Sequence, residues 1–101
     1  MNEQKLKGMI GLAVRARQAS AGADACRMLI RSGECGVLLI DGGTADNTRE
    51  KAEEICERTG TWKRILPEGL IEAATGKNNR ILGIRKGSFA EQILKESGDE
   101  T

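Results

Sequence analysis

The stretch Gly36-Val37-Leu38-Leu39-Ile40-Asp41 (GVLLID) is an unbroken apolar run that ends in an aspartate followed by two glycines. A short run of aliphatic residues is typical of a strand that is buried on both faces. Such a strand needs a layer of helices on each side of its sheet. The stretch therefore predicts an α/β fold with three layers, an α/β/α sandwich.

Two helices are expected before this strand. Apolar residues recur at helical spacing over residues 3–15, and a second helical pattern covers residues 23–31. The segment 18–22, which consists mostly of small residues, interrupts the two patterns.

Helices and strands also alternate after this strand. The expected elements are helices over 46–58 and 68–75, strands over 61–66 and 80–85, and a closing helix from Phe89. We expect Asp46 or Asn47 to cap the first of these helices and Gly76 to end the second.

Length and composition limit the class of protein. The chain has 101 residues, of which 39% are hydrophobic and 31% charged, and it is expected to form one domain over residues 1–96 with a flexible tail over residues 97–101. No stretch reaches the roughly 18 apolar residues of a membrane span, and the N-terminus lacks the apolar segment of a signal peptide. We therefore expect a cytoplasmic protein with no membrane partner.

Cysteine and histidine usage argues against catalysis and metal binding. The chain has three cysteines without a C-x-x-C spacing and no histidine, which predicts buried free thiols rather than a zinc site or a disulfide framework. Neither common glycine-rich phosphate motif is present, and no serine lies in a G-x-S-x-G elbow. We expect a protein that is not an enzyme and needs no metal or cofactor. A small ligand-binding or catalytic domain is the alternative.

The charges are distributed unevenly along the chain. The net charge is only +1, yet residues 1–31 carry six basic and two acidic residues, whereas residues 32–60 carry three basic and seven acidic residues. This asymmetry predicts one cationic and one anionic face. A polyanionic partner is expected to contact the first third of the chain.

The turn at Gly22 suits the binding of an anion. It precedes a predicted helix whose free N–H groups and dipole attract phosphates, and glycine lets a ligand approach the backbone closely. The alternative is an ordinary surface helix with an ion pair between Asp24 and Arg27.

Three stretches carry a family resemblance: GLAVRARQASAGADACRMLIRSGECGVLLIDGGTADNTREKAEEIC, LIEAATGKNNRILGI and KGSFAEQIL, which span about Met9 to Leu94. In this order they resemble the L-seven-Ae and L-thirty-e ribosomal protein family, and most of all its small bacterial YlxQ-like branch. The resemblance implies an α/β/α sandwich with a central four-stranded mixed sheet. It also implies RNA binding in ribonucleoproteins, through recognition of kink-turns, which are internal loops with tandem sheared G·A pairs.

The resemblance implies that the helix after Gly22 contacts the RNA, but three residues depart from the family pattern. Asp24 stands where the family has asparagine, Ala25 where it has glutamate, and Met28 where it has lysine. Aspartate accepts hydrogen bonds from guanine but donates none, and methionine brings no charge. Two hypotheses stay open: kink-turn binding is retained with altered contacts, or it has been lost and the domain binds proteins.

The second implied contact is the loop between the helix ending at Gly76 and the last strand. Residues 77–80 occupy the loop that packs against flipped-out bases in the family, and their two asparagines suggest hydrogen bonds to bases or ribose. The alternative is an ordinary polar loop. The candidate RNA-binding residues are Arg17, Gly22, Ala23, Asp24, Arg27, Met28, Gly76, Lys77, Asn78, Asn79 and Arg80.

We therefore expect an RNA-binding protein whose partner is structured RNA of the kink-turn type, with ribosomal RNA as one candidate. Lys77, Arg80 and Arg27 are expected to contact phosphates, and Asp24 and Asn78 to read bases. The alternative is a protein-interaction module that uses the acidic helix over residues 46–58.

Overall fold

The computed structural model describes residues 1–98, and within them four strands form one mixed sheet in the order β1-β4-β2-β3. Strand β4 is antiparallel to both β1 and β2, whereas β2 and β3 are parallel. The strands are β1 (Ala19–Ala21), β2 (Cys35–Asp41), β3 (Lys63–Leu66) and β4 (Ile81–Arg85). The predicted four-stranded mixed sheet is confirmed.

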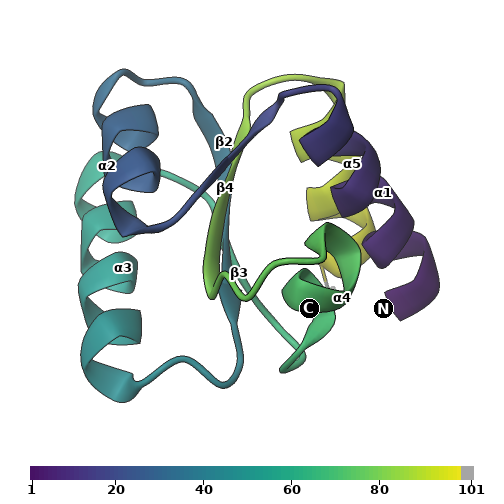
Figure 1. The fold of residues 1–101 in the computed structure, drawn as a ribbon. Coiled ribbons are helices and arrows are strands. Elements are labelled where there is room, and N and C mark those ends of the chain that lie inside the picture. Colours follow the sequence, from purple (N-terminus) through teal and green to yellow (C-terminus); the bar gives the residue numbers. More distant parts are fainter. Residues whose placement is uncertain (99–101) are drawn as a thin grey trace.

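Among the described residues, five helices cover the two faces of this sheet (Figure 1). One face carries α1 (Glu3–Arg15), α4 (Leu70–Thr75) and α5 (Ser88–Ser97). The other face carries α2 (Ala23–Arg31) and α3 (Asp46–Thr59). The three-layer α/β/α sandwich is confirmed. No helix within residues 1–98 combines the length and apolarity needed to span a membrane.

Strand β2 is the centre of both apolar layers, as its sequence predicts. Val37 and Leu39 point toward α1 and α5, whereas Leu38 and Ile40 point toward α2 and α3. All four side chains are at most 2% exposed. Burial of each stabilises the fold by about 1.5–3 kcal/mol relative to an exposed position, so β2 holds the two helical layers together.

Strand β1 was not predicted from the sequence pattern, in which residues 18–22 only separate two helices. Its three small residues show neither an apolar run nor a clear alternation. They become a strand only because they pair with β4, with Ala19 opposite Ile84 and Ala21 opposite Leu82. This strand therefore depends on tertiary contacts rather than on its own sequence pattern.

The expected cap of α3 is wrong by one residue. Ala45, with φ −58° and ψ 145°, is the N-cap, and no side chain caps this helix end. Asp46 is already the first helical residue, and its carboxylate accepts a hydrogen bond from Arg49 at 3.1 Å. A tight turn, in which the Thr44 amide donates to the Asp41 carbonyl, directly precedes this cap.

Helix α5 ends at Ser97, which is buried and donates a hydrogen bond from its hydroxyl to the Ile93 carbonyl. The expected tail over residues 97–101 therefore overlaps the helix at Ser97, and its last three residues lie outside the described part of the chain.

All three cysteines are free and buried, as predicted. They lie in the apolar layer between the sheet and the helix pair α2 and α3. Burial raises the pKa of Cys26 from 9.0 to about 11 and that of Cys35 to about 12, and burial also raises the pKa of Cys56. The thiols are therefore protonated at neutral pH and poorly suited to nucleophilic chemistry.

The sheet has two chemically different ends. At the first, which we call the Gly22 end, β1, β2 and β3 finish and β4 begins. At the second, which we call the Trp62 end, β1, β2 and β3 begin and β4 finishes. Because α1, α2 and α3 each precede a strand that starts at the Trp62 end, all three helices finish there.

Candidate nucleic-acid interface

The backbone at Gly22 forms an open N-terminus for α2. Gly22 has φ 92° and ψ 159°, a conformation that side-chain-bearing residues rarely adopt. No side chain caps the helix end, and a Cβ at this position would have no atom within 4 Å. The first-turn N–H groups of α2 therefore face space that an anion can enter.

The loop after α4 is held by its own hydrogen bonds. Gly76 ends α4 with φ 75°, and the Lys77 amide donates to the Thr75 hydroxyl at 3.2 Å. The Asn79 amide then donates to the Lys77 carbonyl at 2.8 Å. Lys77 and Asn78 are exposed, so the loop presents an ammonium and an amide to solvent.

The sheet brings Gly22 and this loop together. The Gly22 amide donates to the carbonyl of Ile81 at 3.2 Å, and Ile81 directly follows the loop. Two segments that are more than fifty residues apart in sequence thus meet at the Gly22 end. Ala23, Asp24, Arg27 and Met28 follow Gly22 on α2, and Met28 is 71% exposed.

Arg17 lies elsewhere. It has φ 59° at the end of α1, and its neighbour Gln18 accepts a hydrogen bond from the Arg85 amide at the Trp62 end. Strand β1 separates this position from Gly22 by about 10 Å of extended chain. The structure therefore does not place Arg17 with the other candidate residues.

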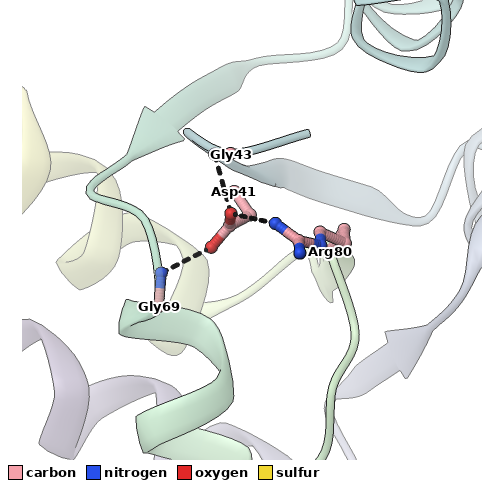
Figure 2. Close-up of polar contacts among 4 residues, drawn as sticks. All are labelled: Asp41, Gly43, Gly69 and Arg80. Carbon is pink, nitrogen blue, oxygen red and sulfur yellow. Dashed lines mark hydrogen bonds and ion pairs between the residues drawn. The ribbon is translucent and has the colours of Figure 1, made fainter. Parts of the chain in front are cut away.

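A buried carboxylate organises the loops of the Gly22 end (Figure 2). Asp41, only 3% exposed, accepts hydrogen bonds from the amides of Gly43 at 2.8 Å and Gly69 at 2.9 Å. The Arg80 guanidinium donates to the same carboxylate at 3.1 Å. Asp41 thus links the loops that precede α3, α4 and β4.

Sequence reasoning missed this role of Asp41. Its position as the last residue of a doubly buried strand was the available signal, because a charge there must find partners. The contact also gives Arg80, which was expected to bind phosphate, a partner within the protein. One of its N–H groups is used by Asp41, although 48% of the side chain is exposed.

Three arginines of the Gly22 end form ion pairs. Arg27 pairs with Asp24 at 3.0 Å, Arg49 pairs with Asp46 at 3.1 Å, and Arg80 pairs with Asp41. The first two pairs are largely exposed and contribute little to stability. Because Arg80 pairs with Asp41, Lys77 is the one cation of the loop over residues 77–80 that makes no ion pair within residues 1–98.

A groove between α2 and α3 adjoins this end of the sheet. It has a volume of about 220 Å³, and its apolar wall includes Ala23, Ile30 and Ile55. Arg27 and Lys51 also line it. Within residues 1–98, no group of three histidine, cysteine or carboxylate side chains is arranged to hold a metal ion.

No protein-family model and no curated protein sequence matches this chain. The structure is similar to that of a protein of unknown function from Bacillus halodurans, with a TM-score of 0.84, 20% identity, and coverage of 90% of this chain and 94% of the other. It is also similar to the Giardia lamblia 15.5kD RNA binding protein, with a TM-score of 0.74, 13% identity, and coverage of 93% and 85%. At these identities the similarity establishes a shared α/β fold.

Proposed function

We propose that this chain is a non-catalytic protein that binds structured RNA of the kink-turn type through its Gly22 end. The observation that carries the proposal is the meeting of the uncapped N-terminus of α2 with the loop over residues 77–80. The shared fold with a Giardia protein described as RNA-binding supports it. The sequence resemblance to the L-seven-Ae family and its YlxQ-like branch supports it too. We propose that the protein acts in cytoplasmic ribonucleoproteins.

In this proposal the two segments have distinct tasks. The free N–H groups after Gly22 bind phosphate or guanine acceptors, and the exposed Asp24 carboxylate accepts from guanine N–H groups. Lys77 neutralises a phosphate, and the Asn78 amide forms a hydrogen bond with an unstacked base or with a ribose hydroxyl. Shape and backbone contacts supply most of the affinity.

A second candidate function is a protein-interaction module that has lost kink-turn binding. The three ion pairs at the Gly22 end favour it, because paired arginines offer less net charge to a phosphate backbone. Helix α3 would then be the docking face, since Glu50, Glu54 and Glu57 on it are exposed.

A titration with kink-turn RNA separates the two functions. The RNA should be blunt-ended, and its control should carry Watson–Crick pairs in place of both G·A pairs. We expect binding that requires the G·A pairs and weakens as salt rises. The Lys77→Ala variant should lower the slope of log affinity against log salt by about one, the loss of one phosphate contact.

The matched control for this variant is Lys7→Ala, since Lys7 is exposed on α1 and makes no ion pair within the described chain. The slope of its log affinity against log salt should equal that of the wild type. Equal, weak binding of both RNAs would refute the proposal and favour the interaction module. A gain in affinity in Asp24→Asn with Met28→Lys would support the family correspondence at these positions.

A further inference from the structure

Trp62 is a large apolar side chain left in solvent. It is the chain's only tryptophan, it directly precedes the edge strand β3, and it is 62% exposed. The Arg64 guanidinium lies 5.9 Å from the centroid of its ring, a cation–π distance. Arg64 also donates to the carbonyls of Lys63 and Leu94, so the cation beside the ring is anchored to the backbone.

Two hollows open on the surface beside Trp62. The larger, of about 460 Å³, lies between this side chain and the start of α5, and Lys86, Gly87 and Gly33 contribute to its wall. The smaller, of about 370 Å³, is lined by Lys63 and Arg64. An exposed indole between two hollows is accessible to a flat ring, and Lys86 and Lys63 are close to where such a ring would lie.

The topology gathers cations around this end of the sheet. Helices α1, α2 and α3 finish here with a basic residue in the last turn, which the helix dipole favours. The basic residues of the Trp62 end are Arg15, Arg17, Arg31, Arg58, Lys63, Arg64, Arg85 and Lys86. The nearby acids are Glu34, Glu57 and Glu91.

Most of these cations make no ion pair within residues 1–98, unlike Arg27, Arg49 and Arg80 at the Gly22 end. Within residues 1–98, Arg85 is the one member of the set that forms an ion pair, with Glu34 at 3.5 Å. Arg17 lies beside the edge strand β1, and Trp62 beside the other edge strand, β3. Four strands at about 4.8 Å spacing make this cationic strip roughly 14 Å wide.

We propose that the Trp62 end binds single-stranded RNA, with one base stacked on Trp62 and the phosphates following the cationic strip. A stacking aromatic beside a cationic track is the arrangement that single strands require, because every base has a flat face and every nucleotide a phosphate. Tryptophan and arginine are also enriched in protein interfaces, but a strip of basic residues with a single ion pair within residues 1–98 matches a phosphate backbone better than a protein surface. This surface lies at the opposite end of the sheet from Gly22 and does not rest on kink-turn binding.

The fluorescence of Trp62 tests the proposal directly, because no other tryptophan contributes. Titration with an oligouridine of about twelve nucleotides should quench it saturably, and rising salt should reverse the quenching. In anisotropy titrations with a labelled oligouridine, Trp62→Ala should bind about tenfold more weakly. Lys86→Ala should lower the salt slope by about one, whereas Lys7→Ala should leave it unchanged.

Three outcomes would overturn the proposal. One is an oligouridine affinity that does not change in Trp62→Ala, provided that urea unfolding shows this variant to be folded. Another is the absence of saturable quenching at low salt. The third is quenching of Trp62 by the blunt kink-turn RNA as strong as that by oligouridine, because it would mean that the two ends do not bind separate ligands. Failure of kink-turn binding alone would leave the proposal intact.

Discussion

At the scale of single residues, Asp41 is the buried charge that joins the loops of the Gly22 end. Two of the three groups that donate to its carboxylate, Gly69 and Arg80, come from loops far along the chain, whereas Gly43 is two residues away. A buried carboxylate is stable only when such donors replace water. The sequence predicts the buried strand that ends in Asp41, but chain packing sets the two distant donors, so no local pattern could name them.

The Asp41→Asn substitution should therefore destabilise the fold by about 1–3 kcal/mol in urea unfolding, because it removes the charge that three donors face. Asp46→Asn is the matched control, since Asp46 also pairs with an arginine but its side chain is 82% exposed. That variant should lose no more than about 1 kcal/mol. Equal small losses in the two variants would show that Asp41 does not hold the loops together.

At the scale of elements, the predictable parts are those that carry their own pattern. Helix α2 begins and ends at the residues expected from its spacing, and β2 was predicted within one residue because its apolar run is continuous. Strand β1 and the N-cap of α3 could not be predicted. The first depends on pairing with β4, and the second on a turn between Asp41 and Thr44.

The uncapped start of α3 leads to a stability prediction. Ala45→Ser should stabilise the protein by about 1 kcal/mol, because Ala45 has the extended backbone of an N-cap but no side-chain acceptor. Ala73→Ser, at an exposed position within α4, is the control and should give no gain, since serine is a weaker helix former than alanine. Urea unfolding of both variants checks this, and a loss in Ala45→Ser would contradict the assigned cap.

At the scale of the whole molecule, the arrangement of charge was the least predictable feature. The excess of basic residues in the first third of the chain was read correctly, but the expectation placed them together on one face. In the structure Arg15, Arg17 and Arg31 lie at the Trp62 end, whereas Arg27 lies on the first turns of α2. Because successive segments cross the sheet in opposite directions, neighbours in sequence separate to its two ends.

The most direct test of kink-turn binding at the Gly22 end is an NMR titration of the ¹⁵N-labelled protein with blunt-ended kink-turn RNA. We expect amide shifts concentrated at residues 22–28 and 76–80, with the Trp62 indole and Lys86 amide unchanged. The same RNA with Watson–Crick pairs in place of its G·A pairs should shift few of these amides. Shifts centred on the Trp62 end, or equal shifts with both RNAs, would contradict the assignment of kink-turn binding to the Gly22 end.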